Sequence, residues 1–103
     1  MLFDQKDFLR ASVGNDEKWW RTCHAYFFCG TPFGTEAGSE PYRTPDKAKA
    51  KQLLAEAGYK GEKITLMGPA DIQFINAYTM VTAENLKKIG MNVDLVIADW
   101  GSI

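Results

Sequence analysis

The sequence predicts an α/β fold built around a strand, a helix and a second strand near the C-terminus. Apolar and polar residues alternate from Lys63 to Met67 and again from Asn92 to Ile97, the two-residue period of half-buried strands. Between them a helix is predicted from about Ile72 to Ile89, ended by Gly90. Strands joined by such a crossover are parallel. The expected buried stripe of the helix consists of Ile75, Tyr78, Thr82, Leu86 and Ile89, with Val81, Ala83 and Asn85 at its edges.

The length and charge of the chain exclude several classes of protein. Its 103 residues suffice for one small domain, residues 1–103. Such a domain buries roughly 60 to 70% of the surface that its unfolded chain exposes. The formal net charge is −1 and no basic face emerges, so nucleic acid and acidic membranes are poor partners. No apolar run approaches the roughly 18 residues of a membrane span, and the charged N-terminus is not a signal peptide.

The chain divides into two parts. Residues 1–45 predict a helix followed by an aromatic and Pro/Gly-rich loop, and residues 46–103 predict a helix, a strand, a helix and a strand. The first residues look like the middle of an amphipathic helix, and the segment from Asp99 to Ile103 follows directly on a strand. We therefore expect the chain to be a fragment of a larger protein.

The first part opens with a short helix from about Asp4 to Val13, ended by Gly14. A dense aromatic cluster follows. We expect it to be buried core rather than the wall of a ligand site, because a small domain needs large side chains inside it. From Gly30 to Pro45, three prolines and three glycines predict a long loop, which is either functional or packs on a missing part of the protein. The aromatic cluster that precedes this loop consists of Trp19, Trp20, Tyr26, Phe27 and Phe28.

A second helix is predicted at the start of the second part. Thr44 can cap it, Pro45 suits its first position, Asp46 stands in its first turn and Gly58 ends it. Its lysines are expected to remain in solvent. Its apolar side consists of Ala50, Leu53, Leu54 and Ala57.

Few residues offer catalytic or metal-binding chemistry. A lone histidine such as His24 is more often structural than a catalytic base. Cys23, His24 and Cys29 lack the spacing and the second cluster of a zinc site, so we predict no metal, no cofactor and no catalytic residue. Cys23 and Cys29 can close a small disulfide loop in an oxidising compartment and would remain thiols in the cytosol.

The loop after the first predicted strand is the candidate binding site. Ligands of parallel sheets gather at the carboxyl ends of the strands, and here that position is Gly68, Pro69, Ala70 and Asp71. Gly68 permits a ligand to approach the backbone, and Pro69 stiffens the loop. Asp71 can hold a cationic group, although capping of the following helix is its more ordinary role. The amides at the start of that helix favour an anion.

Several segments along nearly the whole chain match one family in order and spacing. They are Asp46-Lys-Ala-Lys-Ala-Lys-Gln-Leu-Leu-Ala-Glu-Ala-Gly-Tyr59, Ile64-Thr-Leu66, Leu86-Lys-Lys-Ile-Gly-Met-Asn-Val-Asp-Leu95 and Asp99-Trp-Gly101, preceded by Asp4-Gln-Lys-Asp-Phe8, the Gly14 turn and Cys29-Gly-Thr-Pro32. Together they resemble the family 5 extracellular solute-binding proteins, the dipeptide, oligopeptide and nickel receptors of ABC importers.

This resemblance implies both a fold and a function. The fold would be part of the second lobe of a periplasmic-binding-protein-like (type II) protein, whose two lobes close around a ligand. The function would be capture of a peptide or another small solute outside the cytoplasmic membrane, and its delivery to the ABC permease subunits without catalysis. The parent protein would carry a signal peptide and act in the periplasm or outside the cell.

The resemblance also indicates where this chain differs from peptide-binding relatives. In those proteins the loop after the strand contributes a basic residue for the ligand carboxylate, whereas residues 68–73 contain neither Arg nor Lys. The acidic loop that grips the ligand's amino group in those relatives lies beyond Trp100, after Ile103. We therefore expect little ligand affinity from this chain by itself.

Two functions of other classes remain open. A small α/β enzyme or enzyme subunit using His24 or Asp71 would lose turnover when either residue is replaced. A separate interaction domain would form a stoichiometric complex through Trp19 or Trp20. An apolar surface left open in a fragment would also promote self-association.

Overall fold

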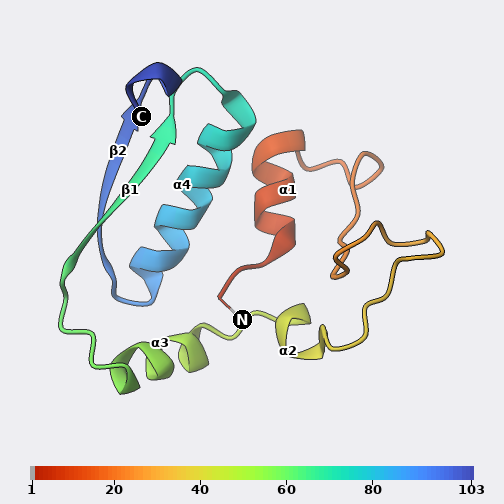
Figure 1. Ribbon diagram of the computed structural model, residues 1–103, viewed down its shortest axis with the longest axis horizontal. Helices are drawn as coiled ribbons and strands as arrows, with labels where there is room; N and C mark the ends of the chain where they lie inside the picture. The colour runs from red at the N-terminus through yellow and green to blue at the C-terminus, as the bar shows by residue number, and fades with distance from the viewer. Residues whose placement is uncertain (1) are drawn as a thin grey trace.

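A parallel strand pair and the helix that connects its strands form the centre of the computed structural model, which describes residues 2–103 (Figure 1). Strands β1 (Lys63–Pro69) and β2 (Asn92–Ala98) are parallel, and helix α4 (Gln73–Lys88) packs on both. Ile72 and Ile89 flank the helix as its caps. The predicted α/β fold is thus confirmed, with the limits of this unit close to those expected from the sequence.

The apolar side of the sheet lies against α4. Ile64 lies opposite Val93 and Leu66 opposite Leu95, and all four are half-buried. The buried positions of the helix lie slightly away from the predicted stripe, since Thr79 is buried whereas Tyr78, whose ring meets Phe8 of α1, stays 38% exposed. The buried residues of α4 and of its C-cap are Thr79, Ala83, Asn85 and Ile89.

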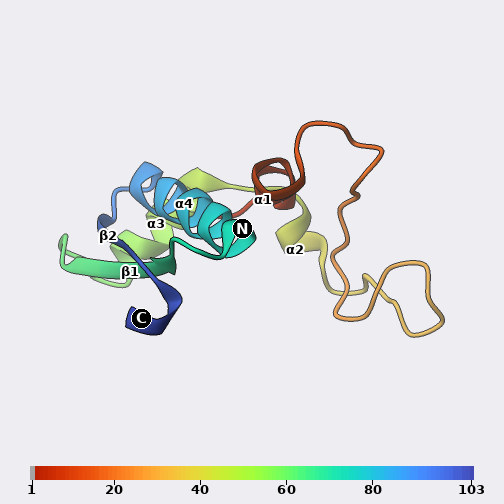
Figure 2. The same ribbon diagram turned by 90° about the horizontal axis from the view of Figure 1, so that it is seen from above.

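Helix α1 (Gln5–Val13) packs on α4, so that α4 lies between the sheet and α1 (Figures 1 and 2). It begins at Asp4, whose carboxylate accepts a hydrogen bond from the Lys6 backbone N–H at 2.9 Å. The Phe8 ring meets the Tyr78 ring edge-on, with 5.5 Å between centroids. The chain therefore forms three layers, with aromatic contacts between α1 and α4.

Helix α3 (Lys47–Glu56) begins two residues later than predicted. Its cap is Asp46, whose carboxylate accepts the Lys49 backbone N–H at 2.8 Å. The predicted cap at Thr44 is wrong, because Asp46 takes the cap position and Thr44 is instead the residue that ends α2 (Glu40–Arg43). The helix ends as predicted, at Gly58 with φ of 81°.

A short helix interrupts the stretch from Gly30 to Pro45. This helix, α2 (Glu40–Arg43), is four residues long and carries Pro41 in its first turn, where proline is tolerated. The prediction that the whole stretch is a loop is therefore wrong for these four residues. Residues 14–39 contain no helix or strand and extend away from the layered part of the chain (Figure 2).

The aromatic cluster is exposed, so the prediction that it forms core is wrong. Tyr26 is 96% exposed, Phe28 86% and Trp19 76%, whereas Trp20 is half-buried and its indole N–H donates to the Gly14 carbonyl at 2.8 Å. These rings are exposed because their segment contains neither a helix nor a strand that would pack them against another layer.

The chain exposes more surface than a compact domain of its size. Its accessible surface is 7360 Å², whereas a folded monomer of this mass exposes about 5,800 Å². The radius of gyration is 15.7 Å, against about 13 Å for a compact chain of this length. The single domain 1–103 stays a prediction, and Met1 lies outside the described residues.

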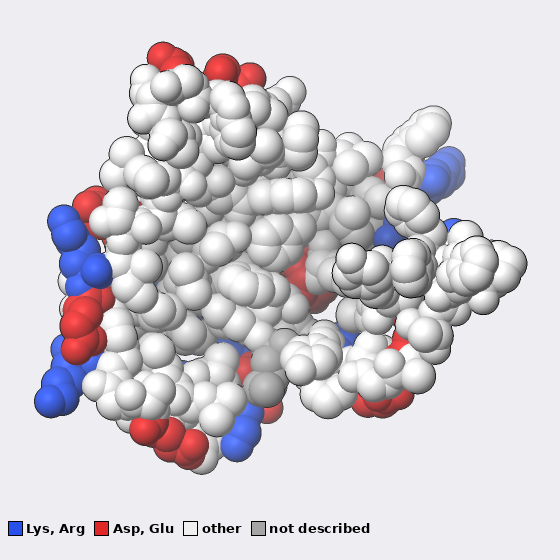
Figure 3. Space-filling model, viewed as in Figure 1, with Lys and Arg blue, Asp and Glu red and all other residues white. Residues whose placement is uncertain are grey.

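On the face that Figure 3 shows, charged side chains lie mainly along the rim. Figure 3 shows basic and acidic groups interspersed there, around a centre with few charges and without a large basic patch on this face. Of the helices described, none is long and apolar enough to cross a membrane.

Candidate functional site

The carboxyl ends of β1 and β2 meet at one edge of the sheet, where the predicted binding loop lies (Figure 1). The Ala70 backbone N–H donates to the Ala98 carbonyl at 2.8 Å. One carboxylate oxygen of Asp71 accepts the Trp100 backbone N–H at 3.0 Å. The loop after β1 is therefore fixed to the segment after β2, and Ala70 and Asp71 are exposed at this edge.

Gly68 and Pro69, the other two residues of the predicted site, are buried beneath α4. A β-carbon on Gly68 would overlap the Thr79 side chain, so this glycine allows the helix to approach the strand. The Pro69 carbonyl accepts a hydrogen bond from the Asn76 side-chain amide at 3.0 Å. Gly68 and Pro69 thus support the loop, while Ala70 and Asp71 face solvent.

Asp71 does not cap α4, so the more ordinary role predicted for it is wrong. Ile72 is the cap residue, and no side chain of residues 2–103 accepts a hydrogen bond from the first turn. The Asp71 carboxylate turns instead towards Trp100. The first amides of α4 thus lack a side-chain cap, which leaves them able to receive an anion.

Trp100 is a further residue at this edge, beyond the four residues that the sequence predicts there. It begins the short 3-10 helix η1 (Trp100–Ser102) directly after β2, and its side chain is 58% exposed. The signal that could have indicated it is positional, because Trp100 follows β2 as Asp71 follows β1, and parallel strands end at the same edge. Trp100 is thus tied to this edge through its backbone N–H, which donates to Asp71.

Cys23 and Cys29 form a disulfide, with 5.9 Å between their Cα atoms. The bond closes the loop that carries Tyr26, Phe27 and Phe28. Both candidate sulfur ligands of a metal are therefore engaged in the bond, and residues 2–103 hold no cluster of three metal-ligating side chains.

His24 is held by Glu36. The Glu36 carboxylate accepts the His24 backbone N–H at 2.9 Å and lies 3.6 Å from the imidazole Nδ1. The hydrogen bond from the His24 backbone holds the pKa of Glu36 below its usual value, and the positive charge of Arg43 acts in the same direction. His24 thus connects the disulfide loop to the segment before α2, as a structural histidine would.

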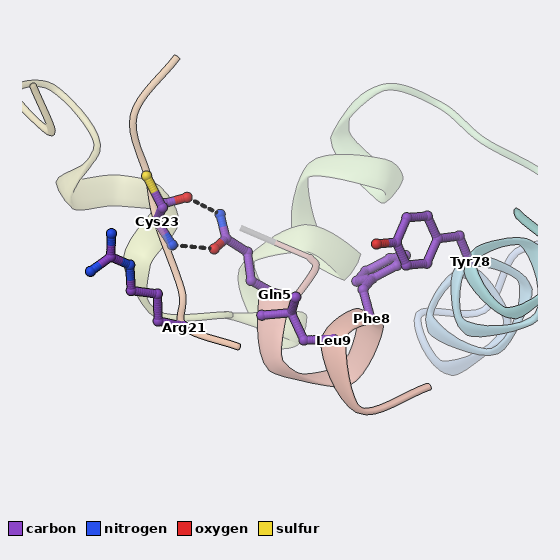
Figure 4. Close-up of a pocket in the computed structure, with 6 residues that line it drawn as sticks. All are labelled: Gln5, Phe8, Leu9, Arg21, Cys23 and Tyr78. Carbon is purple, nitrogen blue, oxygen red and sulfur yellow. Dashed lines mark hydrogen bonds between the residues drawn. The ribbon is translucent and has the colours of Figure 1, made fainter. Parts of the chain in front are cut away.

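A recess of about 300 Å³ lies between α1, α4 and the chain beside the disulfide (Figure 4). No periodic pattern in the sequence indicates it, since its walls come from three separate segments. Within it, the side-chain amide of Gln5 is hydrogen-bonded to both the backbone N–H and the carbonyl of Cys23, as Figure 4 shows. The residues that line it are Gln5, Phe8, Leu9, Arg21, Cys23 and Tyr78.

Over nearly its whole length, the chain is similar to binding proteins of ABC transporters. It is 36% identical over 110 aligned positions to the probable peptide ABC transporter periplasmic-binding protein y4tO of Sinorhizobium fredii. That alignment covers 99% of this chain and 19% of the relative, so the chain spans about a fifth of the relative's length. No protein-family model matches the chain.

A solved structure shows the same fold. The crystal structure of the ABC transporter substrate-binding protein CtaP from Listeria monocytogenes matches with a TM-score of 0.77 at 22% sequence identity. The match covers 98% of this chain and 20% of that protein. The arrangement of helices and strands described above therefore occurs within a much longer polypeptide.

Proposed function

Because this chain is similar over nearly its whole length to a periplasmic-binding protein of an ABC transporter, we propose that it forms part of one lobe of a solute receptor. The receptor captures a peptide or another small solute outside the cytoplasmic membrane, delivers it to the permease and performs no catalysis. The observation that carries this proposal is the 36% identity to a peptide transporter's binding protein, which extends over 99% of the chain.

The carboxyl edge of the sheet supplies the ligand contacts in this proposal. Asp71 is exposed there and has one carboxylate oxygen without a hydrogen bond from the described residues. The amides of the first turn of α4 have no side-chain cap. A carboxylate suits the amino group of a zwitterionic solute, and helix amides suit its carboxylate. These amides would replace the basic residue that residues 68–73 lack.

The disulfide supports an extracytoplasmic location. Disulfides form and persist in the periplasm and outside the cell, and cytosolic thiols are kept reduced. The Cys23 to Cys29 bond therefore fits a receptor that meets its solute outside the membrane. The partner of the complete receptor would be the membrane subunits of an ABC permease.

The test uses the polypeptide encoded by the complete reading frame that contains this segment. Its affinity for a panel of dipeptides and oligopeptides is measured by calorimetry, together with that of an Asp71→Asn variant. The matched control is Asp16→Asn, because the Asp16 carboxylate also accepts a backbone N–H, from Lys18 at 3.0 Å, in a turn distant in sequence.

We expect Asp71→Asn to weaken binding about tenfold through loss of a charge-assisted contact. Asp16→Asn should bind as the parent does. Peptide binding that is absent from the complete protein would contradict the proposed function, and equal affinities for the two variants would contradict the role of Asp71.

The exposed tryptophan supports one alternative. Trp19 is 76% exposed, which suits an interaction domain that contacts a protein partner. That function predicts a stoichiometric complex that Trp19→Ala abolishes. A catalytic role for His24 has less support, because its imidazole Nδ1 lies 3.6 Å from the Glu36 carboxylate within the fold.

A further inference from the structure

The disulfide loop and the turn that follows it carry a group of largely exposed rings, here called the four-ring cluster: Tyr26, Phe27, Phe28 and Phe33. We propose that the four-ring cluster packs against a part of the parent polypeptide outside these 103 residues, as a permanent contact within the receptor. The proposal rests on this chain being part of a longer receptor, and it is independent of which solute that receptor captures.

The four-ring cluster forms a nearly continuous apolar surface. Tyr26 and Phe28 are almost fully exposed, and Phe33 is 77% exposed. The rings of Tyr26 and Phe27 meet edge-on with 5.1 Å between centroids, and the Phe27 ring lies 6.4 Å from that of Phe33. Single exposed rings are common on folded proteins, whereas several that lie together indicate a surface that another part covers.

The cluster has a defined shape although its segment contains neither helix nor strand. The disulfide joins Cys23 to Cys29, and the Thr31 backbone N–H donates to the Phe28 carbonyl at 3.3 Å. A β-carbon on Gly34 would overlap the Phe28 carbonyl oxygen, so the turn after the disulfide packs closely on the loop. The rings are thus held before they are covered, and little conformational freedom would be lost on docking.

The rest of the parent polypeptide is large enough to cover the cluster. The chain corresponds to 19% of the relative from Sinorhizobium fredii and to 20% of the CtaP structure. Residues 14–39, which include the cluster, extend away from the layered part (Figure 2). The chain exposes about 1,500 Å² more than a compact monomer of its mass. Interfaces between domains of one polypeptide bury about 600–1,500 Å², so the excess matches one such interface.

The charge of the loop favours a permanent contact over an encounter with a separate protein. Residues 23–34 contain no Lys, Arg, Asp or Glu. Contacts between separate molecules, such as a receptor and its permease, use charged groups for steering, whereas the cores of permanent interfaces are depleted of them. A segment of the same polypeptide needs no steering, because its tether supplies a high local concentration.

The experiment uses the complete polypeptide with its disulfide intact and without added peptide. Hydroxyl-radical footprinting with mass spectrometry measures the oxidation rates of Tyr26 and Phe28 in the folded and in the urea-unfolded protein. Thermal unfolding then compares the parent with the double variant Tyr26→Ser and Phe28→Ser. The matched control is Tyr26→Phe with Phe28→Met, which keeps two large apolar side chains at the same positions.

We expect both rings to oxidise severalfold more slowly in the folded protein, because a covered ring is shielded from the radical. The serine variant should lower the Tm of the complete protein by about 5 °C through the loss of two packed rings. The control should unfold close to the parent. In the 103-residue chain by itself the same serine variant leaves stability unaltered, since there the rings lie in solvent.

Oxidation of both rings at the rate of the unfolded protein would overturn the proposal. Protection that appears only with added peptide would overturn it by making the cluster a wall of the solute site. Protection only at high protein concentration would make a second copy the occupant. The footprint needs no variant, so it decides the matter even where the serine variant does not fold. Because it is recorded without peptide, a failure of solute binding would contradict the proposed function and leave this result unaffected.

Discussion

Gly68 of β1 lies directly beneath Thr79 of α4, and the Thr79 side chain fills the space where a β-carbon on residue 68 would stand. Thr79 is held there, since its hydroxyl donates to the Ile75 carbonyl at 2.9 Å and its side chain is β-branched. This contact sets how closely the helix approaches the sheet, and so fixes the start of the loop that follows β1.

Gly68→Ala should destabilise the fold by about 1–3 kcal/mol, because the added methyl group has no space. Urea unfolding measures the change. Gly101→Ala is the matched control, since a β-carbon there meets no atom within 4 Å, and it should change stability by less than about 0.5 kcal/mol. The double variant Gly68→Ala with Thr79→Ala should lose less than the sum of the two single losses. Equal stabilities of the two alanine variants would show that the contact imposes no constraint.

The sequence predicted the central unit because local patterns decide it. The alternation in β1 and β2, the helical period of α4 and the stop at Gly90 all indicate the same arrangement, and the structure has it. Such agreement between levels is what makes this part of the fold readable from residues alone.

The remaining features depend on contacts that no local pattern encodes. Asp71 directly precedes a helix, a position that favours capping. Its carboxylate instead accepts a hydrogen bond from the backbone N–H of Trp100, 29 positions later. The rings of Tyr26 and Phe28 are as apolar as core residues, but their segment has no element to pack against. The recess lined by Phe8 and Tyr78 exists only once α1 has packed on α4.

Reduction of the disulfide should destabilise the segment around it. Cys23 and Cys29 are six positions apart, and closing a loop of that size contributes about 2 kcal/mol through the entropy of the unfolded chain. Hydrogen exchange at the Thr31 amide, which donates to the Phe28 carbonyl at 3.3 Å, reports the local opening with and without a reductant. In the double variant Cys23→Ser with Cys29→Ser, exchange should already be fast and the reductant should change nothing. Slow exchange that persists after reduction would show that other contacts hold the loop.

Replacement of the outermost rings should alter surface properties without altering stability. Tyr26→Ser together with Phe28→Ser should lower the binding of a hydrophobic dye and the tendency to self-associate, because these rings are 96% and 86% exposed. The free energy of unfolding should change by less than about 0.5 kcal/mol. Phe8→Ala serves as the contrast, since its half-buried ring packs on Tyr78 and its removal should cost about 2 kcal/mol. A large loss of stability in the serine variant would mean that the rings are buried in solution.

The interaction of Glu36 with His24 should make stability depend on pH in the acid range. The hydrogen bond from the His24 backbone N–H and the nearby charge of Arg43 lower the pKa of Glu36 from its ordinary value of 4.5. A carboxyl group whose pKa is lower in the folded state binds its proton more readily in the unfolded chain. The contribution of Glu36 to stability is therefore complete above pH 4.5 and is lost as the pH falls through the lower pKa of the folded state.

Thermal unfolding of the parent and of Glu36→Gln, from neutral to acid pH, measures this dependence of stability on pH. The parent should be the more stable at neutral pH, and the difference should shrink as the pH falls. Glu84→Gln, which removes a carboxylate outside the ion pairs of the described residues, is the control. A difference between the parent and Glu36→Gln that stays constant across the acid range would show that the charge of Glu36 does not stabilise the fold.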